Sequence, residues 1–140
     1  MAVNASTEYA LRALIEIYSS KNGLISTQQL CDQQKLPRKF AEYLLATLKN
    51  AGILLSSPGV KGGYSLARPA GEITFLDVMK AVDDNSLDPA CAENKGEYCL
   101  GENCKLTHFL DELSAKQQKL FDSYTLKKIA TTRKPRRSAQ

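Results

Sequence analysis

The fold is decided by residues 26–52, which read STQQLCDQQKLPRKFAEYLLATLKNAG. Ser26 and Thr27 are favourable caps for a short helix, because their hydroxyl groups accept hydrogen bonds from the free amide groups of a first turn. Pro37 is tolerated at the first position of a helix and opens a second one, which ends at Gly52. A short helix, a turn and a longer helix indicate a helix-turn-helix.

A β-hairpin is predicted directly behind this unit. Residues 53–56 form a short apolar strand, residues 57–63 (SPGVKGG) are rich in turn residues, and residues 64–67 alternate like a returning strand. In this position the hairpin is a wing, and its glycines let the backbone pass close to a ligand surface such as a row of phosphates. The predicted fold class is therefore mainly α with a small β-hairpin, a winged helix-turn-helix.

Two further helices are predicted around the winged unit. Ser6 or Thr7 can cap a first helix that stops at Asn22-Gly23, and Thr74 can cap another that ends at residues 83–85. Both carry apolar residues at three- and four-residue steps.

A long C-terminal helix is predicted over residues 105–130. Its apolar positions recur at helical spacing over a stretch longer than a domain of this size needs for its own core. We expect the surplus apolar face to pair with a second copy of the chain, so that the helix serves dimerisation. This stripe consists of Phe109, Leu110, Leu113, Leu120, Phe121, Tyr124 and Ile129.

The composition is typical of one globular domain. The chain has 140 residues, of which 43% are hydrophobic and 24% charged, values close to the averages of soluble proteins. No apolar run approaches the ~20 residues that cross a bilayer, and residues 1–14 lack the layout of a signal peptide. We therefore expect a cytoplasmic protein without a membrane partner.

The charge is unevenly distributed along the chain. Residues 1–69 carry eight basic and four acidic residues, residues 70–126 carry five and eleven, and residues 127–140 carry six and none. A basic front segment that contains a wing suggests a polyanion partner, namely double-stranded DNA. For the tail, a solvated and disordered segment is the simpler interpretation.

The residues that favour DNA binding are mostly cationic. The second helix of the helix-turn-helix, which fits the major groove, carries Arg38, Lys39 and Lys49. Lys61 lies in the wing. Glu42 can accept from cytosine N4 while it repels phosphates, so it affects specificity more than affinity. The alternative is that these charges only solvate a helix. The predicted DNA-binding residues are Thr27, Gln28, Arg38, Lys39, Phe40, Glu42, Tyr43, Lys49, Lys61, Gly62 and Tyr64.

Three of the four cysteines lie within fourteen residues, with the spacing Cys91-x7-Cys99-x4-Cys104, and His108 follows. Thiolates bind iron-sulfur clusters and zinc alike. The seven residues between the first two cysteines do not form the close pair typical of zinc sites, which favours a cluster. A zinc site with Cys99, Cys104 and His108, or three free thiols, are the alternatives. Cys31 is expected in the core.

No catalytic pattern accompanies these residues. The chain contains a single histidine and no Ser-His-Asp, H-E-x-x-H or phosphate-loop arrangement. We therefore predict that the protein is not an enzyme and takes no small-molecule substrate.

Several stretches match a known family. They are EYALRAL (8–14), PRKFAEYLL (37–45), AGIL (51–54) and GGYSLARP (62–69), followed by EIT (72–74), the spaced cysteines and YTL (124–126). In these motifs the chain resembles the bacterial winged-helix regulators of the iron-sulfur cluster regulator (IscR) type, which include the nitric-oxide sensor NsrR and the iron regulator RirA. The resemblance covers residues 6 to about 129.

The resemblance implies a homodimer whose late helices cross, with each protomer binding one half of a palindromic operator. It implies that Cys91, Cys99 and Cys104 ligate a 2Fe-2S or 4Fe-4S cluster. The fourth ligand differs among relatives, and the candidates are Glu8 of the partner subunit and His108. We favour Glu8, because its place before the Ala-Leu-Arg motif matches the family, whereas His108 is one residue too far from Cys104.

We therefore predict a sequence-specific DNA-binding transcription regulator whose iron-sulfur cluster senses iron, redox state or nitric oxide. The alternatives are a thiol- or zinc-based regulator of the same fold without a cluster, and an adaptor that binds a protein, not DNA, through the acidic 83–102 loop. The predicted parts are a DNA-binding domain (1–83), a cysteine-bearing cluster loop (84–104), a dimerisation helix (105–130) and a basic, disordered tail (131–140).

Overall fold

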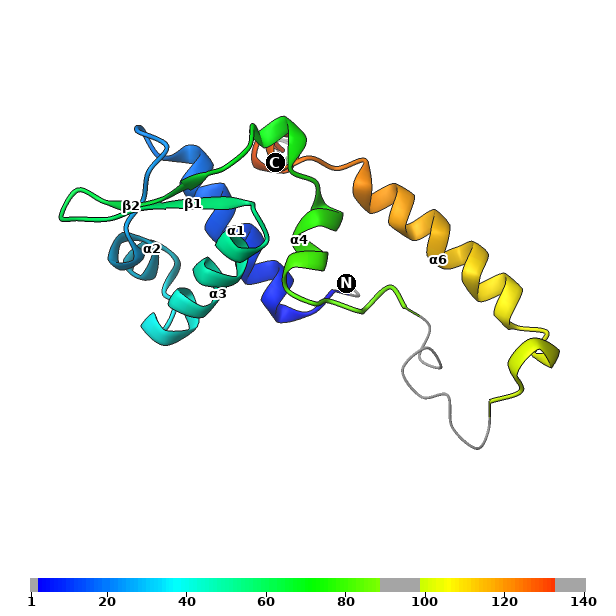
Figure 1. Cartoon of the computed structure of the whole chain (residues 1–140). Coiled ribbons are helices and arrows are strands. Elements are labelled where there is room, and N and C mark those ends of the chain that lie inside the picture. Colours follow the sequence, from blue (N-terminus) through cyan, green and yellow to red (C-terminus); the bar gives the residue numbers. More distant parts are fainter. Residues whose placement is uncertain (1–2, 89–98, 133–140) are drawn as a thin grey trace, which may run out of the picture.

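The computed structural model describes residues 3–88 and 99–132 of the chain. The elements are α1 (Ala5–Ser19), α2 (Thr27–Gln34), α3 (Arg38–Asn50), β1 (Leu54–Ser57), β2 (Gly63–Leu66), η1 (Ala70–Glu72), α4 (Phe75–Ala81), η2 (Gly101–Asn103), α6 (Thr107–Asp122) and α7 (Leu126–Ala130). Figure 1 shows a head, formed by α1–α4, the antiparallel hairpin β1–β2 and α7, and an arm, formed by α6. The predicted winged helix-turn-helix is confirmed.

The core of the head lies where α1 and α3 meet the hairpin, α4 and α7. Its side chains come from apolar positions at three- and four-residue steps. Cys31, next to the buried Leu30, is only half-buried, so it borders the predicted core. The largest fully buried side chains are Leu14, Ile17, Leu30, Leu44, Leu45, Leu48, Ile53, Leu54, Ile73, Val78, Met79 and Leu126.

The helix-turn-helix forms where the sequence predicts it. Ser26 caps α2 by accepting from the Gln29 amide (3.1 Å), and the Gln29 side chain accepts from the Ser26 amide (2.9 Å), which satisfies two otherwise free donors. Lys35 takes a left-handed conformation (φ 53°) and turns the chain toward α3. Pro37 lies one position earlier than predicted, as the N-cap of α3.

The wing lies against the start of α2 through backbone contacts. Ile25 and Tyr64 exchange hydrogen bonds with N···O distances of 3.0 Å and 2.8 Å. A Cβ atom on Gly63 would lie 2.3 Å from the carbonyl oxygen of Ile25, and one on Gly62 would lie 2.1 Å from that of Ser57. Close approach of backbone therefore requires glycine at both positions. Each strand is displaced by one residue from its predicted bounds.

The predicted single helix over residues 105–130 is wrong, because the chain breaks between α6 and α7. Thr125 at the break is extended (φ −90°, ψ 159°), bridges to Thr74 and caps α7 by accepting from the Lys128 amide (3.2 Å). Leu126 is 1% exposed and anchors α7 in the core of the head. The apolar residues recur at helical spacing on both sides of the break, so the sequence pattern does not reveal the break. No helix within the described ranges is long and apolar enough to span a membrane.

Asp84, three residues beyond α4, is a buried carboxylate with an exposed fraction of 8%. It accepts hydrogen bonds from the Asn4 amide (3.0 Å), from the Thr7 hydroxyl (2.6 Å) and from the amide and hydroxyl of Ser86. Burial raises the pKa of Asp84, but these hydrogen bonds outweigh it and hold the pKa below its usual value.

Neither Ser6 nor Thr7 caps α1 as predicted, because the cap is Asn4, whose side chain accepts from the Thr7 amide (3.0 Å).

Replacing Asp84 with Asn should lower the free energy of unfolding near neutral pH by ~1.5–3 kcal/mol, because an amide cannot accept all the hydrogen bonds that the carboxylate accepts. The folded pKa is lower than the unfolded value of ~3.9, so this stabilisation is complete above the unfolded pKa and is lost as the pH falls through the folded pKa. Urea unfolding at about pH 7 and about pH 3 measures the difference in the free energy of unfolding between the wild type and Asp84→Asn. This gap should be smaller at the lower pH. A gap that does not change with pH would contradict an ionised Asp84.

Gly63→Ala should destabilise the head by ~1–3 kcal/mol, because the new Cβ would overlap the Ile25 carbonyl group and push the wing away from α2. Gly71→Ala is the matched control, since no atom lies within 4 Å of its ideal Cβ position. Thermal unfolding of the two variants provides the comparison. Equal stabilities would show that the wing does not need its contact with Ile25.

Candidate functional site

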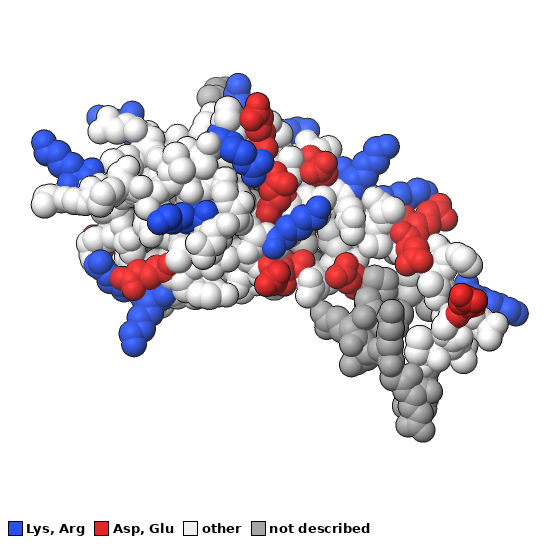
Figure 2. Space-filling view, viewed as in Figure 1, with Lys and Arg blue, Asp and Glu red and all other residues white. Residues whose placement is uncertain are grey.

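One face of the head combines α2, α3 and the wing. The predicted cationic residues Arg38, Lys39, Lys49 and Lys61 are all exposed on these elements. Figure 2 shows Lys and Arg predominating around the end of the head that carries the wing, whereas acidic side chains are concentrated over the middle of the molecule and the arm. The exposed cations therefore lie on the side of the molecule where a polyanion can approach.

A groove of about 490 Å³ separates the start of α2 from the wing. It brings together five of the predicted DNA-binding residues, which are Thr27, Gln28, Arg38, Gly62 and Tyr64. Sequence reasoning missed the serines of β1 that also line it, because their position across from α2 depends on the docking of the wing. The full lining is Ser26, Thr27, Gln28, Arg38, Ser56, Ser57, Pro58, Gly59, Gly62, Gly63 and Tyr64.

The guanidinium group of Arg38 is held by a chain of polar side chains. Its Nε donates to Glu42 Oε1 (3.0 Å), and an Nη atom donates to Gln28 Oε1 (2.7 Å). Gln28 Nε2 in turn donates to Asp32 Oδ1 (2.9 Å), which fixes the orientation of the Gln28 amide. The Arg38–Glu42 pair is exposed and therefore contributes little to stability. Breaking this pair therefore costs little free energy, so Arg38 and Glu42 can each form a hydrogen bond with a base edge instead.

The predicted aromatic residues occupy different environments. Phe40 packs edge-to-face on Tyr9 of α1, with ring centroids 5.4 Å apart, and it therefore has a packing position inside the head. Tyr64 belongs to β2 of the wing and is partly buried against the core of the head. Tyr43 is exposed on α3 and can contact a partner. Sequence reasoning missed Val60, which is fully exposed at the tip of the wing beside Lys61.

The cysteine cluster is described only in part, because Cys91 lies outside the described residues. Cys99 is exposed, and Cys104 is half-buried just before α6. Hydrogen bonds from the Thr107 side chain and from the amide groups of Leu106 and Thr107 lower the pKa of the Cys104 thiol. Cys104 is thus disposed to form a thiolate, the form that ligates metals and attacks disulfides.

The described residues alone do not assemble a metal site. Within residues 3–88 and 99–132, no group of three or more His, Cys, Asp or Glu side chains can hold a metal ion. His108 is exposed one turn after Cys104 on α6. Glu8 is exposed in the first turn of α1, in the head, whereas Cys104 precedes the end of the arm that is remote from the head (Figure 1). The structure does not bring Glu8 and Cys104 of one chain together.

The arm carries an apolar face without a covering element in the part of the chain that the structure describes. Leu106, Phe109, Leu113 and Leu120 are all exposed, at helical spacing along and just before α6. Several large apolar side chains on one helix face, unlike single ones scattered over a surface, indicate an interaction site.

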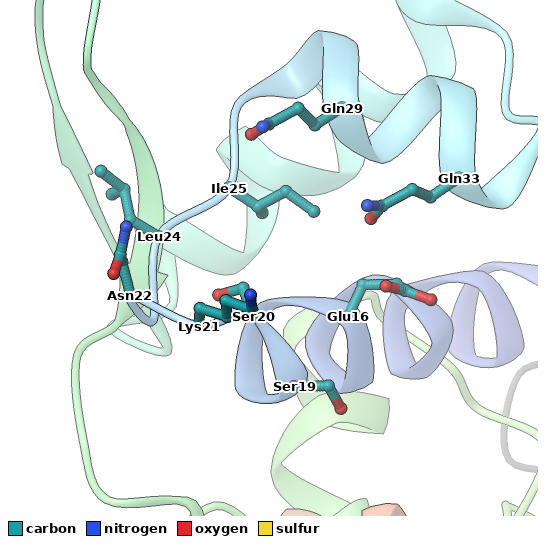
Figure 3. A pocket seen from close by; sticks show the side chains of 9 residues that line it. All are labelled: Glu16, Ser19, Ser20, Lys21, Asn22, Leu24, Ile25, Gln29 and Gln33. Carbon is teal, nitrogen blue, oxygen red and sulfur yellow. The ribbon is translucent and has the colours of Figure 1, made fainter.

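A second hollow, of about 370 Å³, lies between the C-terminal end of α1 and α2. Figure 3 shows Gln29 and Gln33 on the α2 side and Glu16, Ser19 and Ser20 on the α1 side. Its lining is mainly amide and hydroxyl groups, and Glu16 accepts a hydrogen bond from Gln34 Nε2 (2.5 Å). This polar hollow presents no pairing of a nucleophile with a base.

Comparison with known proteins identifies a family and several relatives. Residues 3–132 match the model of the Rrf2 family, an iron-dependent transcriptional regulator. A putative HTH-type transcriptional regulator of Mycobacterium tuberculosis is 34% identical over 59% of this chain and 52% of its own length, so the chain spans about half of that relative. The HTH-type transcriptional regulator IscR of Cronobacter sakazakii is 31% identical over 79% of this chain and 67% of its own length.

The fold also matches a solved structure. CymR, the global cysteine regulator of Bacillus subtilis, superposes with a TM-score of 0.72 and 24% identity, covering 94% of this chain and 97% of CymR. The family match extends over the head, the described cysteines and the arm, not the helix-turn-helix alone. The chain therefore belongs to the Rrf2 family of transcriptional regulators, whose members are not enzymes.

Proposed function

We propose that the protein is a sequence-specific DNA-binding transcription regulator that places α3 in the major groove and the wing along the adjacent backbone. The observation that carries this proposal is the groove between α2 and the wing, which unites Arg38, the amide-rich start of α2 and the glycines of the wing on one exposed basic face. Membership of a family of transcriptional regulators supports it.

The side chains of this face divide into two roles. Lys39, Lys49 and Lys61 are exposed cations that contact phosphates and supply affinity without sequence preference. Arg38 donates to guanine O6 and N7, and Glu42 accepts from cytosine N4, once they separate from each other. The pair supplies specificity, because a wrong base leaves one member without a partner.

A second copy of the chain covers the apolar face of the arm in this proposal. The row formed by Leu106, Phe109, Leu113 and Leu120 supplies the apolar positions at the spacing that two crossing helices need. A homodimer of this kind presents two heads to the two halves of a palindromic operator.

The cysteines form the sensing site in this proposal. Cys91, Cys99 and Cys104 hold an iron-sulfur cluster, with Glu8 of the partner subunit or His108 as the fourth ligand, and the lowered pKa of the Cys104 thiol fits this donor set. When bound, the cluster supplies a centre that responds to iron, redox state or nitric oxide. A thiol-based regulator is the second candidate, because the same lowered pKa makes Cys104 reactive toward oxidants.

The DNA-binding proposal predicts the effect of substitutions on α3. Arg38→Ala should weaken binding to the specific operator by ~1–3 kcal/mol and relax its preference for guanine at one position, whereas Lys39→Ala should weaken binding to all sequences alike and reduce its salt dependence. Glu42→Ala should relax the preference for cytosine. Lys119→Ala, which removes an exposed cation of the arm outside the apolar row, is the control. Unchanged operator affinity in the Arg38→Ala, Lys39→Ala double variant would place the interface elsewhere.

The sensing proposal predicts a coloured protein after anaerobic preparation. Cys91→Ser, Cys99→Ser and Cys104→Ser should each abolish the visible absorbance, because each removes a thiolate ligand, whereas Cys31→Ser should retain it. Iron and sulfide analysis provides the measurement. Comparing the rate of bleaching in Glu8→Ala and His108→Ala identifies the fourth ligand.

Other results would decide between the remaining sensing chemistries. A colourless protein with stoichiometric zinc would support a zinc site with Cys99, Cys104 and His108. A colourless, metal-free protein whose operator affinity changes on thiol oxidation would support the thiol-based regulator.

A further inference from the structure

Within residues 3–88 and 99–132, the arm is attached to the head at two places, of which the first is the C-terminal end of α6. Phe121 of α6 stacks on Phe75 of α4, with ring centroids 5.0 Å apart. The Thr74 hydroxyl donates to Asp122 Oδ1 (3.0 Å), and the backbone bridge between Thr74 and Thr125 follows directly. Aromatic stacking, a side-chain hydrogen bond and backbone pairing converge here, so this end of α6 acts as a pivot.

The second attachment lies near the middle of α6 and is made by residues 84–87, which we call the bracket. At one end of the bracket, Asp84 accepts from the Asn4 amide and the Thr7 hydroxyl of the first turn of α1. At the other end, the carbonyl oxygen of the buried Leu87 accepts from the Ser114 hydroxyl of α6 (3.1 Å). The bracket therefore connects the N-terminal turn of α1 with the arm.

Close packing does not determine how far the arm lies from the head beside the bracket. A cavity of about 250 Å³ is present there, lined by Leu76 and Met79 of α4, by Gln118 of α6 and by the bracket itself. Packed side chains resist small displacements, whereas a cavity of this size accommodates them. The polar bonds of the bracket therefore restrain the separation of α6 from α4 at this level, and the buried charge of Asp84 makes its own bonds costly to break.

We propose that Asp84 and Ser114 are positioning residues that set the angle between the arm and the head, and thereby the spacing of the two operator half-sites. This inference rests on the proposed function, in which the arms of two copies pair and the heads bind DNA. Ser114 and Asp122 are eight positions apart, which is ~12 Å along a helix. A displacement of ~1 Å at Ser114 thus rotates the arm by about 5° around the pivot and moves its far end by about 2 Å.

Such a rotation is large on the scale of an operator. When the two arms are held together, the same rotation moves a part of the head that lies as far from the pivot as the arm is long by about 2 Å. Two such movements change the separation of the heads by up to about 4 Å, close to the ~3.4 Å rise of one base pair. A dimer reads two half-sites whose separation is fixed by the DNA helix. An intact bracket therefore makes the protein selective for one spacing, and a broken bracket makes it tolerant of neighbouring ones.

The experiment compares operators of different length. An operator is first selected from random-sequence DNA with the wild-type protein, and versions with one base pair inserted or removed at its centre are then made. We expect the affinity ratio between the best spacing and its neighbours to fall at least threefold in both Ser114→Ala and Asp84→Asn. Binding to an isolated half-site should stay within twofold of wild type. Asp83→Asn, which changes an exposed aspartate with the same loss of charge, should keep the wild-type ratio.

The possible outcomes are distinguishable. Ser114→Ala removes a single hydroxyl group from a helix, so it tests the bracket even if Asp84→Asn does not fold. An affinity that falls equally for all spacings, in parallel with stability, would overturn the positioning role and leave the proposed function intact. A monomer in sedimentation, or a protein that selects no DNA sequence, would overturn the proposed function and the inference with it.

Discussion

Two backbone hydrogen bonds between Ile25 and Tyr64 hold the wing against the entry to α2, and the arrangement of the basic face depends on them. They are possible only because Gly63 has no side chain to meet the Ile25 carbonyl group. In this position the wing and the start of α2 enclose a groove. Arg38 at the start of α3 also lines this groove. The exposed side chains of this face therefore act on a scaffold that backbone contacts have already fixed.

The sequence predicts the elements whose causes are local. Ser26 and its capping partner lie three residues apart, and the apolar positions of α3 face inward at helical spacing, so the helix-turn-helix follows from the chain itself. The break before α7 does not follow from the local sequence, because it depends on the pairing of Thr74 with Thr125, which are 51 positions apart. The same reason explains why Thr7 is not a cap, since its hydroxyl binds Asp84.

The candidate site shows the same division. Arg38, Lys39 and Lys61 are exposed on the expected face, because charged side chains on a predicted amphipathic helix or a turn remain in water. Phe40 was predicted to meet DNA, yet it packs on Tyr9, a contact between two helices that spacing along one helix does not show. The fixed orientation of Gln28 between Arg38 and Asp32 likewise arises from three side chains on two helices. The sequence thus predicts which side chains are exposed on this face, but not the contacts that these side chains make with one another.

The position of α7 has a consequence for the synthesis of the protein. The head is discontinuous along the chain, because Leu126 completes a buried cluster whose other members lie between Ala10 and Val78. During translation the ribosome must therefore release the cysteines and the arm before the head can close. A chain that ends before Leu126 lacks the last buried residue of this core. The order of the chain thus makes the completion of the head depend on the prior synthesis of the cysteine segment and the arm.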